Sequence, residues 1–319
     1  MSNEKEIGGY FELGGLVKNE WHNGCLKLNS ARNCLRYVIR RKKIKKVNLP
    51  YLLCDSMANA CRKENIEVSF YHIDDEFTPV MDDTMLDGEY ICIVNHYGLL
   101  DNNKLSSLKD KYKNVIIDNT QSFFQTPIAD VDTIYNCRKY FGVPDGAYLF
   151  SGLKKNDLDI SIDISKDRIG HLVGRLEVGA SEYYRDFVEM EELFNDEDVK
   201  KMSKLTDVLM GAIDYNATIN IRRKNIAYIH EKIGKYNKLQ LNIDNMSFMY
   251  PFYVDNSEEI RKELIKNKIY VPLLWPNVLE NSSDSLEYKY AKNIIPIPID
   301  QRYDESDMKK IYEVLKGKI

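Results

Sequence analysis

Long hydrophobic runs and paired cysteines are missing from this 319-residue chain. Its uninterrupted apolar stretches are a handful of residues long, whereas a helix needs roughly 20 to cross a bilayer. The N-terminus lacks the basic-then-apolar layout of a targeting peptide. The six cysteines are scattered, with no CxxC pair, which is typical of free thiols in a reducing compartment. We therefore expect a cytoplasmic protein that does not bind membranes.

Several ligand-binding signatures are also missing. No GxGxxG follows a predicted strand and no GxxxxGKS/T occurs, which argues against a dinucleotide or P-loop site. The five histidines show no metal-ligand spacing, so no metal site is expected. With 45 Lys and Arg against 49 Asp and Glu, the net charge is -4. The basic run at 40–46 is explained by a predicted helix end, and we expect no nucleic-acid partner.

Apolar segments of strand length alternate with segments of helical period in the first half of the chain. Residues 31–43 repeat apolar side chains at intervals of three and four, with Ser30 or Asn29 as a suitable N-cap before them. This alternation predicts an α/β fold, with a mostly parallel sheet sandwiched by helices and ligands at the carboxyl ends of its strands. The other predicted elements are strands at 47–53, 66–73, 90–95, 114–119 and 131–136, and helices at 56–65 and 101–113.

The pattern divides the chain into three predicted parts. Residues 1–28 form an N-terminal arm, residues 29–235 a large α/β domain with a helical segment at 183–235, and residues 236–319 a small α+β domain. The small domain has predicted strands at 240–246, 269–275 and 294–299 and helices at 257–267 and 305–318. The arm carries large apolar side chains that need a cover, either the large domain or a partner copy, namely Tyr10, Phe11, Leu13 and Trp21.

The residues most able to carry chemistry lie in the second half of the predicted sheet. One strand delivers Asp118 at its carboxyl end, the next strand ends near Asn136, and Lys139 follows. An acid and an amine thus reach neighbouring strand ends. Enzymes that use pyridoxal phosphate (PLP) need a lysine to hold the cofactor's aldehyde and a carboxylate to keep its pyridine nitrogen protonated. The alternative is that Asp118 caps a turn and Lys139 is a surface lysine.

The motifs and their order resemble the DegT/DnrJ/StrS family of sugar aminotransferases, which have the fold-type-I architecture of aspartate aminotransferase. The family places Asp-x-x-Gln at the end of one strand and, further on, a lysine followed by an acidic-Gly turn. The resemblance covers about residues 28–235. The segments that carry it are Asn29-Ser30-Ala31-Arg32, Pro50, Ala58-Asn59-Ala60, Asp118-Asn119-Thr120-Gln121, Lys139, Asp145-Gly146, Met202-Ser203-Lys204-Leu205 and Arg222-Arg223.

The resemblance implies a PLP-dependent aminotransferase that converts a keto group of a nucleotide-linked sugar to an amine, with glutamate as a typical amino donor. It also implies a homodimer, because fold-type-I enzymes pair through large two-fold interfaces. Lys139 would be the catalytic lysine and Asp118 the partner of the ring nitrogen. The other implied cofactor-binding residues are Ser30, Ala31 and Arg32 at the phosphate, Gln121 beside the phenolic oxygen, and Asn136 in place of a phosphate-binding hydroxyl.

Two positions depart from the family in ways that bear on the site. Where the family has an aromatic ring that stacks on the cofactor, this chain has Leu53-Cys54, so Tyr51 or Tyr97 would have to substitute. The family also has an Asn-x-Arg before its Met-Ser pair, from which a neighbouring subunit reaches the cofactor. Here Lys201 is the basic candidate at that place.

These departures leave open a relative that retains the fold but binds or regulates instead of catalysing. A dehydratase is a further alternative, but family dehydratases replace the lysine, and Lys139 is present.

Four more features are candidates for the site. Thr133 is the alternative to Asn136 as a phosphate contact. His96 ends a predicted strand, as either a substrate contact or a core histidine with its hydrogen bonds satisfied. The segments 275–277 and 300–303 of the small domain are expected to shape the sugar-nucleotide pocket.

Overall fold

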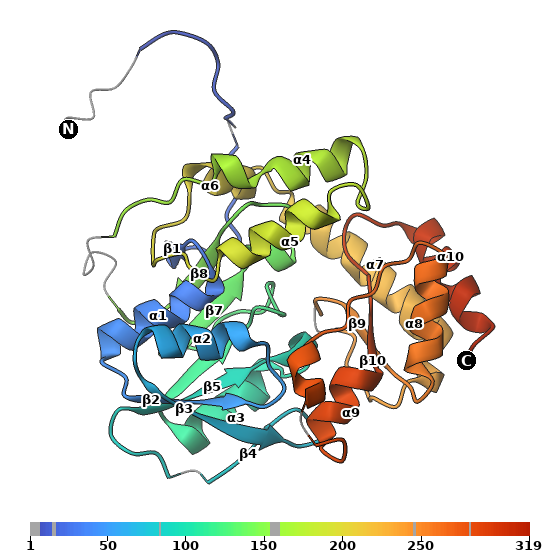
Figure 1. The fold of residues 1–319 in the computed structure, drawn as a ribbon, viewed down its shortest axis with the longest axis horizontal. Coiled ribbons are helices and arrows are strands. Elements are labelled where there is room, and N and C mark those ends of the chain that lie inside the picture. The colour runs from blue at the N-terminus through green and yellow to red at the C-terminus, as the bar shows by residue number, and fades with distance from the viewer. Residues whose placement is uncertain (1–6, 15–16, 83, 154–159, 245–246, 281) are drawn as a thin grey trace.

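An eight-stranded sheet forms the centre of the computed structural model, which describes residues 7–14, 17–82, 84–153, 160–244, 247–280 and 282–319 (Figure 1). The strands of this sheet are β1 (Leu26–Leu28), β2 (Lys46–Pro50), β3 (Glu67–Ile73), β4 (Pro79–Val80), β5 (Glu89–Val94), β6 (Val115–Asp118), β7 (Asp132–Asn136) and β8 (Ala147–Phe150). Their order is β4-β3-β2-β5-β6-β7-β8-β1. Because the run from β3 to β7 is parallel throughout, the predicted mostly parallel α/β sheet is confirmed.

Ten α-helices and a second sheet surround or extend this centre in the described residues. The helices are α1 (Ala31–Lys42), α2 (Asp55–Lys63), α3 (Asn102–Tyr112), α4 (Gly170–Glu177), α5 (Tyr184–Leu193), α6 (Lys204–Gly211), α7 (Tyr215–Ile233), α8 (Ser257–Lys266), α9 (Leu286–Asn293) and α10 (Glu305–Lys316). The second sheet consists of β9 (Tyr250–Tyr253) and β10 (Ile294–Ile297).

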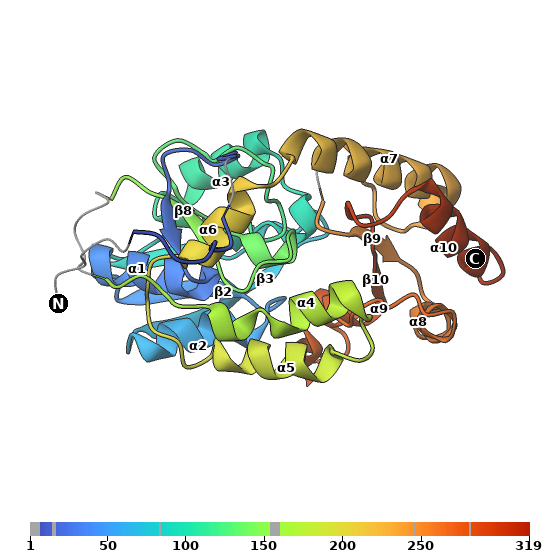
Figure 2. The ribbon, with the colours of Figure 1, turned by 90° about the horizontal axis from the view of Figure 1, so that it is seen from above.

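Helices cover both faces of the large sheet, as Figure 2 shows from above. Helices α1 and α2 pack on one face, and α3 packs on the other. Strand β5 shows the reason, because successive side chains of a strand point to opposite faces. Cys92 and Val94 join the core beneath α1, whereas Ile91 and Ile93 join the core beneath α3. The near-continuous apolar strands of the sequence therefore follow from burial on both sides.

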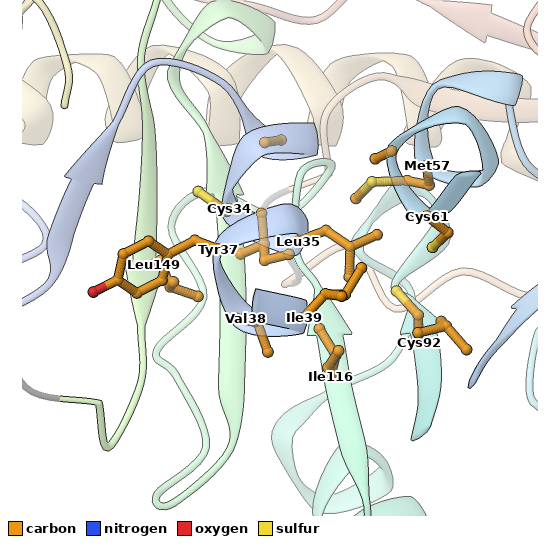
Figure 3. Close-up of a cluster of buried hydrophobic side chains, with 14 of the residues drawn as sticks. Cys34, Leu35, Tyr37, Val38, Ile39, Met57, Cys61, Cys92, Ile116 and Leu149 are labelled. Carbon is orange, nitrogen blue, oxygen red and sulfur yellow. The ribbon is translucent and has the colours of Figure 1, made fainter. Parts of the chain in front are cut away.

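Helix α1 connects the core to the edge where the strands end. Ser30 is its N-cap, and its Oγ accepts a hydrogen bond from the backbone N of Asn33 at 3.3 Å. Leu35 and Val38 are fully buried on the sheet side of the helix, beside Ile116 of β6 (Figure 3). This packing holds the first turn of α1 at the carboxyl ends of the parallel strands.

Strands β1 and β8 were not predicted from the sequence. Strand β8 runs antiparallel to β7 and pairs on its other side with β1, which comes from the predicted arm. In the loop between β7 and β8, Gly146 has a positive φ of 110°, and a Cβ there would lie 2.8 Å from the Thr206 side chain. The Asp145 carboxylate accepts hydrogen bonds from the backbone N and Oγ of Ser203 at 2.9 and 2.6 Å. The loop that contains Lys139 is therefore fixed against α6.

The C-terminal part has its own sheet and core, and it extends to one side of the large sheet in Figure 2. Strand β9 pairs antiparallel with β10. Helix α7 begins at the cap residue Asp214, which accepts a hydrogen bond from the backbone N of Ala217 at 2.8 Å and separates α7 from α6. Fully or nearly fully buried members of this core include Ile229, Phe252, Leu264, Ile295, Met308 and Leu315.

Two of the strands predicted in this part do not form. Residues 240–244 have no strand, and residues 245–246 of the same prediction lie outside the described residues. Segment 269–275 is irregular because Pro272 has no backbone N–H to donate and Trp275 has a positive φ of 55°. These predictions were wrong, since apolar composition alone does not supply the partner strand that a ladder requires.

Among the described residues of the N-terminal arm, the large side chains differ in how far the rest of the chain covers them. Tyr10 and Phe11 are fully exposed and Leu13 is mostly exposed. Trp21 instead packs edge-on against Phe124, with ring centroids 5.4 Å apart.

None of the helices in the described part of the chain has the length and apolar content needed to cross a membrane. Within the same residues, no group of three or more His, Cys, Asp or Glu side chains is placed to hold a metal ion. Five of the six cysteines are buried, and Cys54 is exposed.

Candidate active site

A pocket lies where α1 begins and where β5, β6 and β7 end. This is the carboxyl edge of the parallel strands, where sheets of this kind bind their ligands. The structure brings all seven catalytic and cofactor-binding residues expected from the sequence to this one pocket. These lining residues are Ser30, Ala31, Arg32, Asp118, Gln121, Asn136 and Lys139.

Asp118 is the last residue of β6, and its side chain is almost fully buried. Its Oδ1 accepts a hydrogen bond from the backbone N of Thr120 at 2.9 Å. Burial raises the pKa of this carboxyl, whereas the hydrogen bonds of Thr120 and the charge of Lys139 act in the opposite direction. A buried carboxylate of this kind is suited to a protonated ring nitrogen, because a charge-assisted hydrogen bond offsets the cost of burying the charge.

Lys139 ends a short 3₁₀ turn, η2 (Cys137–Lys139), that follows β7 directly. Its Nζ lies 5.1 Å from the centre of the Phe248 ring. The next residue, Tyr140, donates its hydroxyl hydrogen to the backbone O of Gln121 at 2.7 Å. That bond joins the loop that carries Lys139 to the loop that follows Asp118. The two loops therefore hold the acid and the amine in fixed relative positions.

Arg222 of α7 connects the loop that carries Lys139 to the C-terminal part of the chain. Its guanidinium carbon lies 4.6 Å from the centre of the Tyr140 ring, and its Nη2 donates to the backbone O of Ser247 and Phe248 at 2.9 and 2.7 Å. Gln301 accepts a hydrogen bond from Arg222 at 3.0 Å and donates one to the backbone O of Tyr140 at 2.5 Å. Segment 300–303 therefore contacts the loop that carries Lys139. Among the described residues, the segment does not line the pocket.

The first turn of α1 forms the side of the pocket that is most favourable to an anion. The N-terminus of a helix presents free N–H groups and the positive end of its dipole. Arg32 lies in this turn and donates from Nη1 to Oδ1 of Asn195 at 2.6 Å. Asn136 lines the same pocket, whereas Thr133 is buried in the sheet and donates its hydroxyl hydrogen to a backbone carbonyl at 3.3 Å. Of the two proposed phosphate contacts, only Asn136 therefore reaches the pocket.

The aromatic side chain of the pocket comes from an unexpected element. In the described structure, neither Tyr51 nor Tyr97 lines the pocket, while Trp275 does, together with Cys54. Tyr51 stacks instead on surface side chains, and Tyr97 is buried edge-on against Trp275, with ring centroids 5.7 Å apart. The backbone N of Tyr97 donates to Oε1 of Gln121 at 2.6 Å. Trp275 was expected at a sugar pocket from its position only, and the structure places it in the wall.

His96 is a core residue in this structure and does not contact the pocket among the described residues. One ring nitrogen, Nε2, lies 2.7 Å from the backbone O of Leu52, and the ring packs edge-on against Trp275 at 5.4 Å. Burial lowers the pKa of His96 to about 4, which keeps the ring neutral near pH 7. His96 thus packs against Trp275 and helps to hold that side chain in the pocket wall.

Lys201 lies away from the pocket of its own chain. Its backbone bridges Leu28 and Ile162, and its side chain lines a separate groove beside β1. Asn277, near Trp275, donates from its side chain to the backbone O of Leu53 at 2.9 Å and so ties the C-terminal part to the pocket rim.

Some lining residues were not singled out from the sequence. They are Met57 and Ser56 of α2, Val94 at the end of β5, Thr120, and Arg138 immediately before Lys139. Arg138 could have been found, since a second cation beside a candidate catalytic lysine is a visible signal. The apolar members could not, because their residue types are those of any core.

Comparisons with known proteins agree with this architecture. No model of a known protein family matches the sequence, and no curated protein sequence matches it. The structure is similar to a DegT/DnrJ/EryC1/StrS aminotransferase from Brucella abortus, with 14% identity, 92% of this chain and 85% of the other covered, and a TM-score of 0.62. It is also similar to a sugar aminotransferase from Micromonospora echinospora, with 13% identity, coverage of 92% and 87%, and a TM-score of 0.62.

A third similar structure is NtdA from Bacillus subtilis with bound cofactor PMP, at 12% identity, 92% and 72% coverage and a TM-score of 0.61. The chain thus has the fold of the DegT/DnrJ/EryC1/StrS aminotransferases, and the fold expected from the resemblance is confirmed.

Proposed function

We propose that the protein is a PLP-dependent aminotransferase that converts a keto group of a nucleotide-linked sugar to an amine. The observation that carries the proposal is the meeting of Asp118 and Lys139 in one pocket, beside the first turn of α1. The fold shared with sugar aminotransferases supports the reaction class and the sugar.

The side chains of the pocket fit PLP by their chemistry. Lys139 offers a primary amine for the aldehyde, and Asp118 offers a buried carboxylate for the ring nitrogen. Ser30, Ala31 and Arg32 surround the helix N-terminus, which suits the phosphate, and Gln121 and Asn136 add polar groups. When bound, PLP supplies a conjugated ring that takes up the electron pair released at the amine-bearing carbon.

Three side chains of the protein have separate roles in the proposed reaction. Asp118 holds the proton on the ring nitrogen in its ionised form, which the nearby positive charge of Lys139 favours. Lys139, once its amine is free, would carry a proton between the substrate carbon and the cofactor carbon, first as general base and then as general acid. Trp275, supported by Tyr97 and His96, closes the wall and keeps water from the reacting atoms.

A spectroscopic titration tests this function. Purified protein mixed with PLP should show a visible absorbance band, and glutamate should bleach it as the amino group is transferred. Borohydride followed by peptide mapping should place the reduced cofactor on Lys139. A chain that binds PLP but does not respond to amino donors would favour the non-catalytic alternative. A chain that binds no PLP at saturating concentration would exclude the proposal.

We also propose that the protein works as a homodimer. Helices α4 and α5 lie side by side on the outside of the molecule in Figures 1 and 2. The two helices and the residue after α4 carry several exposed large apolar side chains, and single soluble chains seldom leave many of these uncovered. The last turn of α5 contacts Arg138 through Glu191, so a partner on this face would adjoin the pocket. This α4–α5 face consists of Val173, Leu176, Val178, Tyr184, Phe187 and Leu193.

Leu176→Glu is expected to weaken the dimer by roughly 100- to 1000-fold, because each of two copies loses about 2 kcal/mol of apolar burial. Leu176 is 86% exposed in the single chain, so the fold itself should retain its stability. Light scattering coupled to size exclusion at micromolar concentration measures the effect. The matched control is Ile265→Glu, an exposed apolar residue of α8, which should leave the dimer intact. A wild-type monomer mass with and without PLP would refute the dimer.

A further inference from the structure

Two arginines, Arg32 and Arg138, are among the residues that line the pocket. The end of α5 and the residues after it hold both of them. Nη2 of Arg138 forms an ion pair with Glu191, and Nη1 of Arg32 donates to Oδ1 of Asn195 at 2.6 Å. Phe194 lies between these two contacts in sequence, and the Arg138 guanidinium sits 4.1 Å from the centre of its ring.

Arg32 and Arg138 bring two positive charges to this side of the pocket, and the Glu191 carboxylate, which pairs with Arg138, brings one negative charge. Burial lowers the pKa of Arg32, Glu191 opposes that effect, and Arg138 adds to it. The side chain of Arg138 is only 14% exposed, whereas that of Glu191 is 39% exposed, so solvent screens the carboxylate more than the guanidinium. A buried guanidinium whose charge is only partly balanced costs free energy, and a bound anion lowers that cost. The geometry thus favours an anionic ligand with several oxygens, since planar guanidinium groups match phosphate well.

We propose that Arg138 binds a phosphate group together with Arg32, and that this phosphate is the one PLP carries. The inference rests on the proposed function, because it assigns a further residue to the same pocket. Arg138 directly precedes Lys139, so a group held by both residues would be anchored at two neighbouring points. Both arginines belong to the same chain.

Comparing PLP with pyridoxal, which lacks the phosphate, tests the assignment. Dissociation constants are measured by absorbance for cofactor-free wild type, Arg138→Gln and Arg138→Lys. Arg138→Gln should weaken PLP binding about 10- to 100-fold, the range for a lost charge-assisted hydrogen bond, and should leave pyridoxal binding unchanged. Arg138→Lys should show a smaller loss for PLP only. The matched control is Arg185→Gln, because Arg185 lies on the exposed side of α5 and pairs with Glu189 at 2.8 Å.

Each other outcome overturns the assignment. Equal weakening of PLP and pyridoxal would mean that Arg138 supports only the fold of the pocket, and no change for either would mean that it does not contact the phosphate. A selective loss of nucleoside diphosphate binding would assign the cluster to the substrate instead. If circular dichroism shows that Arg138→Gln does not fold, the same comparison is decided by Arg138→Lys, where an equal loss or no loss overturns the proposal. Failure of wild type to bind either PLP or pyridoxal would refute the proposed function itself.

Discussion

Replacing Lys139 with alanine is expected to abolish covalent attachment of PLP and to lower transaminase turnover by about 10⁴-fold, the upper range for losing a general acid and base. Lys139 is the one lysine among the pocket-lining residues of the described structure, so no neighbour can take over its amine. The measurement combines the visible spectrum with the rate of amino transfer from glutamate. The fold should persist, because the Lys139 side chain is only half-buried at the pocket.

Lys104→Ala is the matched control for this variant. Lys104 lies on α3 and pairs with Glu76 at 2.5 Å on the surface, so its removal should change neither the spectrum nor the rate. The assignment would be wrong if the alanine variant at 139 retained a borohydride-sensitive band. It would also be wrong if peptide mapping of wild type placed the cofactor on another lysine. Lys154 and Lys155, the nearest others in sequence, lie outside the described residues.

Replacing Asp118 with asparagine is expected to lower turnover at least about 100-fold, the scale at which one electrostatic contact in a water-poor site affects a barrier. A neutral amide does not hold the ring nitrogen in its protonated form, so the ring takes up electrons less well. Turnover of PLP-loaded protein under saturating substrate measures this. Unchanged turnover would show that another residue faces the ring nitrogen.

The same variant should stabilise the cofactor-free protein. Burial raises the pKa of Asp118 in the folded state, so the ionised carboxyl destabilises the fold at pH values above that pKa. The cost begins to shrink as the pH falls through the folded-state pKa, and it is gone below the lower pKa of the unfolded chain, where the carboxyl is protonated in both states. The amide of the Asp118→Asn variant would carry no charge at any pH, and its oxygen can still accept the Thr120 hydrogen bond.

We therefore expect Asp118→Asn to raise the free energy of unfolding at pH 7, and with it the Tm of the cofactor-free protein. The gain should shrink as the pH is lowered. Thermal unfolding of cofactor-free wild type and variant at pH 7 and in mild acid measures both effects. A variant that is less stable than wild type at pH 7 would contradict the expected cost of the buried charge.

Much of the large sheet could be predicted, because the residues whose period predicts strands and helices are also the residues that the fold buries. The strand at 114–119 appears as β6 and the helix at 31–43 as α1, and Ser30 is the N-cap of the two candidates that the sequence offered. The meeting of Asp118 with Lys139 followed from a topological rule, because neighbouring parallel strands end at the same edge. These inferences needed only the period of apolar residues and the position of polar residues at strand ends.

Other features depended on partners that are distant along the chain. Strands β1 and β8 are short, and they exist because each pairs with the other and β8 pairs with β7. Segment 269–275 has strand-like composition but has no partner strand in the described structure, and it instead brings Trp275 to the pocket wall. Sequence patterns carry no information about which distant segment will be available for pairing.

The sequence by itself determined the class of this protein: a mostly parallel α/β chain with an acid and an amine at neighbouring strand ends, as its apolar period and its polar strand ends required. The tertiary structure decided what surrounds that pair. It placed Trp275 in the wall in preference to Tyr51 or Tyr97, and it set Arg138 against Glu191, 53 residues away in the chain. The physical reason is that local propensity acts over a few residues, whereas the position of a buried ring or a paired charge follows from packing among elements far apart in sequence.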